Sequence, residues 1–284
     1  MREDLTFSEC LEQIAESARQ KRLSLWVGAG ISWPTFPLGN ELKFYILEKI
    51  CIEANLSPLF QDHLQEGKDL GAQIEGYPLE AFIERICDCY DIVPALAELF
   101  SAGTPNKNHN TIARLIEKQY LRNVLTTNFD LLIERALEHI GWLRQVDFEV
   151  FSTEKDFQTV DFNQSHPAIF KIHGSADDKD SMRVTLRQVA SRRLSDSRAR
   201  VLGHLLTSEK GDMLVLGYGA KDYFDINPIL SSIIPEKRIF YVDHCTKKTE
   251  VGKLPDAFRN FEGFSIVCDA DRAWSCLREA LLDE

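Results

Sequence analysis

The sequence lacks the features that define several large protein classes. None of its seven cysteines forms a C-x-x-C pair and their number is odd, so neither a zinc ribbon nor a disulfide framework is predicted. No apolar run approaches the ~18–20 residues that cross a bilayer. The charged segment 1–22 has no apolar stretch typical of a signal peptide. We therefore expect a cytoplasmic protein in a reducing compartment, without membrane attachment.

Positively charged residues are fewer than negatively charged ones. The chain has 33 Lys and Arg against 44 Asp and Glu, a formal net charge of −11. A broad nucleic-acid surface needs Lys and Arg to neutralise phosphates, so this balance argues against one. The local exception is an arginine cluster, which is either a solvated helix face or a docking surface for a partner protein or nucleic acid. Its members are Arg183, Arg187, Arg192, Arg193, Arg198 and Arg200.

Short apolar runs alternate with helical patterns along the chain. A hydrophobic fraction of 44% and a charged fraction of 27% are ordinary for a globular protein. The alternation predicts an α/β fold, a Rossmann-like, doubly wound and mostly parallel sheet with an inserted helical module and no zinc ribbon. We expect a single domain over 1–284, with its sheet core at about 22–52 and 120–284 and the module at about 53–119. The predicted strands are 23–27, 123–126, 148–151, 168–172, 213–217, 239–242 and 264–267.

Polar motifs follow four of these runs directly. They are GAGIS at 28–32, TTNFD at 126–130, KIHG at 171–174 and GYG at 217–219. Ligands of open α/β sheets bind where the carboxyl ends of the strands meet. The four motifs therefore predict one site. Two later strand ends carry Asp243 and the pair Cys268-Asp269, whose carboxylates could contact a ribose or cap a helix.

Each motif has a chemical and a structural interpretation. Gly28 and Gly30 allow close approach to a phosphate, although no third glycine completes the dinucleotide fingerprint and a tight turn is the alternative. Asn128 and Asp130 are either ligand contacts or turn and cap residues. His173 could titrate near neutral pH and act as a base. The alternative for His173 is an ordinary surface or core histidine.

In their order and spacing, the motifs resemble those of the sirtuin family. The resemblance spans about 23–269 and implies NAD in the cleft, its diphosphate on the glycine loop and its adenosine half against GYG and the late strands. It further implies that Asn128 contacts the nicotinamide ribose, that Asp130 supports this pocket and that His173 is the catalytic base. The chain departs from the family where the zinc cysteines would lie, because 177–211 contains none.

A second departure concerns the G-I-P-D-F-R segment of the family. Only Phe36-Pro37 matches part of it, and no Asp-Phe-Arg follows. Without these parts the chain is similar to zinc-lacking, NAD-hydrolysing domains of bacterial antiphage defence. The segment 217–222 resembles their G-Y-S-x-x-D motif, with Gly219 in place of Ser.

The resemblance predicts an NAD+ glycohydrolase that releases nicotinamide without a metal, as the NAD-depleting effector of an antiphage system. The implied partners are a second copy of the chain or a defence protein such as a short Argonaute or an ATPase subunit. The alternatives are an NAD-dependent protein deacylase and a non-catalytic sensor of NAD or ADP-ribose. Asn128 and His173 are the predicted catalytic residues. The predicted NAD-binding residues are Gly28, Ala29, Gly30, Ser32, Phe36, Thr127, Asp130, Gly217, Tyr218, Gly219, Asp243, Cys268 and Asp269.

Overall fold

A computed structural model describes residues 6–55, 76–190, 194–207 and 211–282. These residues form one eight-stranded sheet in the order β3-β4-β2-β1-β5-β6-β8-β7. All neighbouring strands pair in parallel except β7, which pairs antiparallel with β8 at one edge. The predicted doubly wound, mostly parallel sheet is confirmed. The strands are β1 (Leu23–Val27), β2 (Asn123–Thr126), β3 (Glu149–Phe151), β4 (Ala168–Lys171), β5 (Gly211–Leu216), β6 (Lys237–His244), β7 (Glu250–Gly252) and β8 (Gly263–Cys268).

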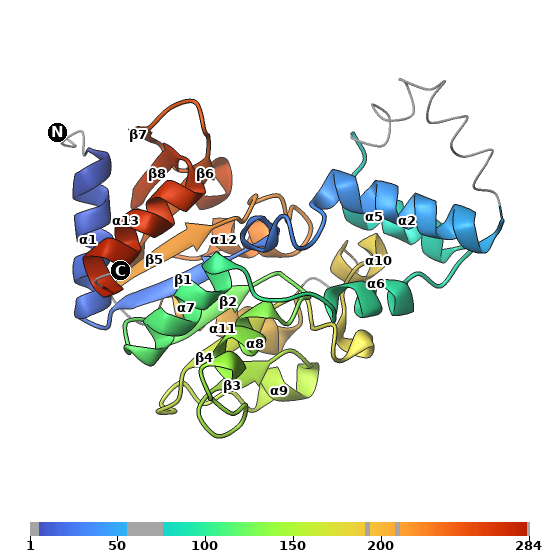
Figure 1. Ribbon diagram of the computed structural model, residues 1–284, viewed down its shortest axis with the longest axis horizontal. Helices are drawn as coiled ribbons and strands as arrows, with labels where there is room; N and C mark the ends of the chain where they lie inside the picture. Colours follow the sequence, from blue (N-terminus) through green and yellow to red (C-terminus); the bar gives the residue numbers. More distant parts are fainter. Residues whose placement is uncertain (1–5, 56–75, 191–193, 208–210, 283–284) are drawn as a thin grey trace.

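Helices cover both faces of this sheet (Figure 1). The α-helices are α1 (Phe7–Arg19), α2 (Gly39–Glu53), α5 (Leu79–Cys87), α6 (Val93–Phe100), α7 (Lys107–Glu117), α8 (Leu132–His139), α9 (Glu154–Gln158), α10 (Leu186–Ala190), α11 (Asp196–Thr207), α12 (Ile226–Ser232) and α13 (Ala270–Leu282). Three short 3-10 helices are η1 (Ala29–Ser32), η2 (Lys179–Ser181) and η3 (Asp256–Phe258). No described helix has the length and apolar character that a membrane crossing requires.

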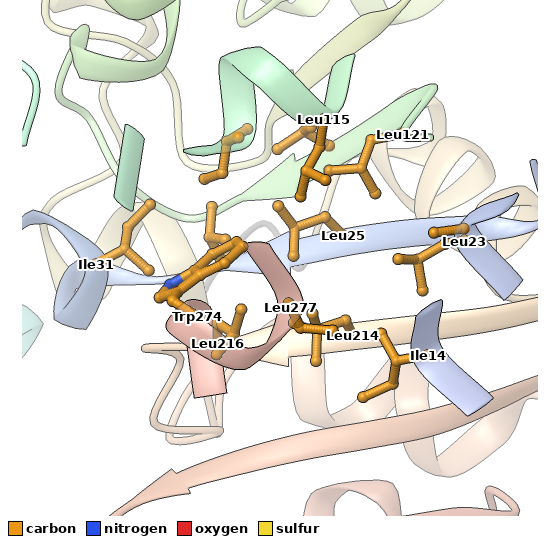
Figure 2. Packing of buried hydrophobic residues seen from close by; sticks show 14 of the residues in the cluster. Ile14, Leu23, Leu25, Ile31, Leu115, Leu121, Leu214, Leu216, Trp274 and Leu277 are labelled. Atoms are coloured by element: carbon orange, nitrogen blue, oxygen red, sulfur yellow. The ribbon is translucent and has the colours of Figure 1, made fainter. Parts of the chain in front are cut away.

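The central strands are mostly apolar because both of their faces are buried. All five residues of β1 and all six of β5 are buried. Successive side chains of a strand point to opposite faces. Leu25 therefore joins a core with α1, α7, α8 and α13, while Trp26 joins a second core with α11, α12 and η3. Figure 2 shows part of the first core, where Leu25 and Leu214 lie close to Leu277.

A third apolar cluster joins α2, α5 and α6, which extend to one side of the sheet in Figure 1. The helices that form this cluster differ from those within the predicted helical module at about 53–119. Leu42 and Ile46 of α2 pack in this cluster rather than in the sheet core. Ile112 and Leu115 of α7 pack against the sheet. The apolar face of each helix thus decides its layer, whatever its place along the chain.

Several local elements differ from the sequence-based expectations. The apolar pattern of residues 130–140 indicates a helix, which begins at Leu132 in the structure, and the Asp130 carboxylate accepts the Leu132 backbone amide at 3.1 Å. The pattern of residues 185–208 indicates a helix in two pieces, which are present as α10 and α11, with 191–193 and 208–210 outside the described residues. Neither the three-residue edge strand β7 nor the five-residue α9 was expected, because such short elements carry no periodicity.

Candidate functional site

The four motifs lie along one edge of the sheet. The last residue of β1, Val27, is level with Thr126 of β2 and Leu216 of β5, and Thr126 is level with Lys171 of β4. The loops that leave these strands therefore open into a common cleft. This is the carboxyl edge, where the sequence analysis expected a ligand.

The cleft contains two cavities that share the loop Gly217–Gly219. The inner cavity, of about 250 Å³, is lined by the side chains of Asn128 and His173, together with Glu80, Arg183 and Asp222. The outer cavity, of about 460 Å³, lies toward β6 and α13. The two residues predicted as catalytic thus line one cavity. Ala29, Ser32, Phe36, Thr127, Asp130 and Tyr218 also line the inner cavity.

Two glycine loops meet backbone to backbone beneath these cavities. The amide of Gly28 donates to Leu216 O at 3.0 Å, and that of Gly30 to Gly217 O at 2.9 Å. A Cβ on Gly28 would lie 2.6 Å from Gly217 O. Gly217 has a φ of +64°, and its Cβ would lie 2.6 Å from the Ile31 nitrogen. The close contact between the loops therefore requires glycine at these positions. The backbone amides of Gly28 and Gly30, which were expected to bind a diphosphate, already donate to acceptors within the protein.

The Asn128 side chain is held with a defined orientation. It is 8% exposed, and its Nδ2 donates to Gly28 O and to Ser32 Oγ, each at 3.2 Å. Both amide protons therefore have acceptors. In the described part of the chain Oδ1 has no protein donor, so it can accept a hydrogen bond from the hydroxyl group of a ligand or from water. The backbone amide of Asn128 donates to Thr126 Oγ1 at 3.0 Å and closes the turn that carries this side chain.

A buried chain of hydrogen bonds supports this orientation. Ser32 Oγ donates to Asp130 Oδ2 at 2.8 Å and lies 3.2 Å from His109 Nε2. The backbone amide of Asn106 donates to His109 Nδ1 at 3.2 Å. The neutral ring therefore carries its proton on Nε2 and donates it to a hydrogen bond with Ser32 Oγ. Burial lowers the pKa of His109 to about 4. His109 lies in the first turn of α7, and this position gives no signal in the sequence of its contact with Ser32.

Lys171 fixes the loop that carries Asn128 and Asp130. Its Nζ donates to the carbonyl oxygens of Phe129 and Asp130, at 3.3 and 2.6 Å. It also forms an ion pair with Glu134 of α8 at 2.8 Å, with side-chain exposures of 1% and 6%. A buried ammonium with three acceptors is satisfied in every direction. The sequence analysis had given Lys171 no role.

His173 is buried against a carboxylate. Its Nε2 lies 3.2 Å from Asp225 Oδ2, and the two side chains are 8% and 2% exposed. Burial alone would lower the pKa of His173, but the hydrogen bond to Asp225 and the negative charges of Asp222 and Asp225 outweigh it and raise this pKa. Burial opposes ionisation of Asp225 as well, yet the His173 ring and Ile226 amide hold its pKa below the usual range.

Two further carboxyl groups face the same cavity. Burial raises the pKa of Asp222, which follows β5, and of Glu80, which projects from α5. Ligand-type atoms of His173, Asp222 and Asp225 lie within 4.8 Å of one another. The hydrogen bond between His173 and Asp225 explains why two of these groups lie together, and we assign no metal to the three.

The outer cavity contains Asp243 as predicted, but not the second predicted carboxylate. It is lined by Gly30, Trp33, Asp243, Asp271 and Trp274, among others. Cys268 is fully buried in the first core, and burial raises its pKa to about 11. Asp269 accepts the Asp271 amide at 3.0 Å, which favours the helix-cap alternative. The structure therefore places neither Cys268 nor Asp269 in the cavity, and Asp271 lies there instead.

The arginine cluster is largely engaged by the fold. Arg198 is 5% exposed and donates to Ser152 O at 2.8 Å, and Arg200 donates to Phe157 O at 2.9 Å. Arg187 pairs with Glu84 of α5 at 3.0 Å. Arg183 lines the inner cavity, and Arg192 and Arg193 lie outside the described residues. Because Arg198 is buried, the described arginines do not form one solvated face.

Comparisons with known proteins agree with the motifs. Residues 122–240 match the family model described as a SIR2-like domain. Over 244 residues the chain is 25% identical to the NAD(+) hydrolase ThsA of Acinetobacter baumannii (strain 532279). That alignment covers 81% of this chain and 42% of ThsA, so the chain spans less than half the length of this relative.

A solved structure matches along almost the whole chain. It comes from work on the structural basis for the mechanism and regulation of Sir2 enzymes. The match covers 96% of this chain and 98% of that chain, with a TM-score of 0.44 and 13% identity. The family and sequence matches confirm the resemblance to SIR2-like proteins that the motifs had indicated.

Proposed function

We propose that the chain is an NAD+ glycohydrolase, which uses water to convert NAD+ into nicotinamide, ADP-ribose and a proton. The observation that carries the proposal is the placement of Asn128 and His173 in one cavity at the carboxyl edge of the sheet. The similarity to ThsA, described as an NAD(+) hydrolase, supports the choice of substrate.

NAD would extend through both cavities. The nicotinamide ribose would occupy the inner cavity and the adenosine the outer one, across the shared loop Gly217–Gly219. The amides of Gly28 and Gly30 are used within the protein, so we do not assign the diphosphate to them. The neighbouring backbone of Ala29 and Gly219, which also lines the inner cavity, is the better candidate.

The chemistry needs positioning and a base. Glycosidic bonds break through an oxocarbenium-like state, and nicotinamide leaves as a neutral molecule. Asn128 Oδ1 would accept a hydrogen bond from a ribose hydroxyl or from the attacking water, which fixes the position of that group relative to C1′. His173 would take the proton that the water loses as its oxygen bonds to C1′. The side chains of Ser32, His109 and Asp130 would hold Asn128 in place for this task.

The test is nicotinamide release from NAD+ by the full chain and by His173→Ala and Asn128→Ala. We expect His173→Ala to lower turnover by about 10²–10⁴-fold, the usual contribution of a general base, while NAD binding stays measurable. The exposed His139 of α8, changed to Ala, is the matched control and should keep normal turnover. Normal nicotinamide release by His173→Ala would contradict the proposed role.

The same assay separates the alternatives. Formation of O-acyl-ADP-ribose from an acetylated peptide would instead support a protein deacylase. Binding of NAD+ without nicotinamide release, in the wild type as in the variants, would support a sensor.

We further propose that the chain is the NAD-depleting effector of an antiphage system. A second copy of the chain, or a defence protein such as a short Argonaute or an ATPase subunit, would be its partner. Bacteria that express the chain should then lose NAD after phage infection, and cells with His173→Ala should not. Equal NAD levels in the two strains would contradict the defence role without affecting the assay on the isolated protein.

A further inference from the structure

Asp225 has both of its carboxylate oxygens engaged. It is the N-cap residue of α12, where Oδ1 accepts the Ile226 amide at 2.9 Å. Oδ2 lies 3.2 Å from His173 Nε2. The side chain is 2% exposed. Two bonds from different elements hold the carboxylate in one orientation, so it presents a fixed acceptor to the imidazole.

The bond to Asp225 determines which ring nitrogen is available to a substrate. An ionised carboxylate only accepts hydrogen bonds, so the neutral imidazole must carry its proton on Nε2. Nδ1 then carries the lone pair. In the described part of the chain no donor or acceptor of the protein engages Nδ1. The ring also lines the inner cavity, so it can meet a reactant there.

Charged groups approach His173 from four elements. Asp225 precedes α12, Asp222 follows β5, Glu80 projects from α5, and Arg183 follows η2. Asp222, Glu80 and Arg183 line the inner cavity, whereas Asp225 is not among its lining residues. Asp225 is the acid that forms a hydrogen bond with the ring. A substrate that enters the cavity would alter the surroundings of Asp222, Glu80 and Arg183. The hydrogen bond between His173 and Asp225 would stay in place.

We propose that Asp225 is the positioning residue of the reaction, which holds His173 as the Nε2–H tautomer so that Nδ1 is the base. The inference rests on the proposed hydrolysis. As the water oxygen bonds to C1′ and the bond between C1′ and the nicotinamide nitrogen breaks, Nδ1 takes the water proton. The imidazolium formed stays paired with the ionised Asp225, and its extra proton then passes to solvent.

The first test is the variant Asp225→Asn. Asparagine has nearly the same volume and can still accept the Ile226 amide, so the start of α12 is preserved. Without the charge, a buried imidazolium is harder to form. We expect kcat for nicotinamide release to fall by more than about tenfold, since neutralising the carboxylate behind a catalytic imidazole lowers turnover by up to about 10⁴-fold. KM for NAD+ should change by less than about threefold, because Asp225 does not face the substrate.

The pH profile distinguishes positioning from a merely structural role. Turnover is lost when Nδ1 becomes protonated, so kcat falls as the pH drops through the pKa of His173. Removing the negative charge lowers this pKa, and the acid limb of the kcat profile should therefore move to lower pH in Asp225→Asn. Asp212→Asn is the matched control, because Asp212 is also buried beside a cation, Arg238, but lies at the amino end of β5. Its profile should keep the wild-type acid limb.

A measurement without turnover tests the same inference. Long-range ¹⁵N–¹H spectra of the labelled full chain report the tautomer of each histidine, and His173→Ala assigns the relevant signal. We expect His173 to be the Nε2–H tautomer in the wild type and to titrate at lower pH in Asp225→Asn. An Nδ1–H tautomer in the wild type would overturn the inference even if the variant failed to fold.

The two tests separate this inference from the proposed function. If His173 shows the Nε2–H tautomer and its Asp225-dependent titration but the chain releases no nicotinamide, the pairing stands and the proposed hydrolysis fails. If nicotinamide is released and Asp225→Asn keeps the wild-type kcat and acid limb, the hydrolysis stands and the positioning role is overturned.

Discussion

His173 lines the inner cavity and His109 is buried behind Ser32, and the two rings have opposite electrostatic surroundings. Burial dominates at His109, where only Glu134 opposes it, and the pKa falls to about 4. At His173 the nearby Asp222 and Asp225 outweigh burial, and the pKa rises. A neutral His109 donates to Ser32 at all physiological pH values, while His173 can exchange a proton. The environment of each ring, rather than its residue type, decides whether the imidazole stays neutral or can take up a proton.

The depressed pKa of His109 predicts a pH dependence of stability. The unfolded chain binds a proton at His109 near pH 6.5, whereas the folded chain binds it only near pH 4. The contribution of His109 is therefore fully present above pH 6.5 and is lost as the pH falls toward 4, by about 3 kcal/mol in total. Urea unfolding near pH 7 and near pH 4 should show a larger loss for the wild type than for His109→Gln, which cannot titrate there.

Other titrating groups, including His173, contribute equally to both proteins and cancel in the comparison. The same loss of unfolding free energy in wild type and His109→Gln would show that His109 does not have the depressed pKa.

The contact between the glycine loops predicts a second residue-scale effect. A Cβ on Gly28 would meet the backbone of Gly217 and Tyr218 at 2.6 Å, and backbone cannot turn aside as a flexible side chain can. We expect Gly28→Ala to lower the unfolding free energy by about 1–3 kcal/mol and to weaken NAD binding, measured by denaturant unfolding and calorimetric titration.

Gly203→Ala provides the control for that substitution. Gly203 lies inside α11 with nothing within 4 Å of its added Cβ. Alanine there should stabilise the chain by about 0.5–1 kcal/mol. Equal effects of the two substitutions would contradict the importance of the loop contact.

At the scale of elements, the ion pair between β4 and α8 connects the core to the cleft. Lys171→Met would leave the Glu134 carboxylate buried without its cation and release the carbonyls of Phe129 and Asp130. We expect the unfolding free energy to fall by about 3–5 kcal/mol, measured in denaturant. The double variant Lys171→Met with Glu134→Leu should recover much of this loss, since no buried charge remains. A double variant no more stable than the single one would contradict this explanation.

The strands and helices of the sheet layers could be predicted because burial on both faces leaves its pattern in the sequence. The runs that became β1 and β5 are examples, and the polar residues after them marked the cleft edge. Asp225 and Glu80 could not be predicted as neighbours of His173, because their contacts depend on how α12 and α5 pack. The role of Gly28 was only half predicted, since the sequence indicates close approach but not that the approaching group is another loop.

At the scale of the whole molecule, the inner cavity is formed between the sheet edge and the helices α2, α5 and α6. Phe36 and Phe100 pack edge to face, with ring centroids 5.5 Å apart, and Phe100 also meets Phe129 of the Asn128 loop. These rings join the third apolar cluster to the carboxyl edge of the sheet. A ligand in the cavity would therefore contact both parts of the molecule at once.

This arrangement predicts that NAD+ stabilises the whole fold. His173→Ala should keep the binding site without consuming the ligand, so its melting temperature should rise with NAD+ concentration. At about 100 times the dissociation constant, binding to the folded state alone adds about 2.7 kcal/mol. Thermal unfolding followed by fluorescence would measure the shift. Adenosine monophosphate, which would fill only the outer cavity, should give a smaller shift. A melting temperature independent of NAD+ would contradict the placement of the ligand.

The pairing of the two glycine loops has a consequence for the protein during its synthesis. The amides of Gly28 and Gly30 donate to Leu216 O at the end of β5 and to Gly217 O in the loop after it, and this segment leaves the ribosome much later. A partly made chain can already carry Asn128 and His173, yet the floor beneath them is missing and Asp225 has not been translated. Nascent fragments should therefore not hydrolyse NAD, and the proposed activity should arise only once β5 has paired with β1.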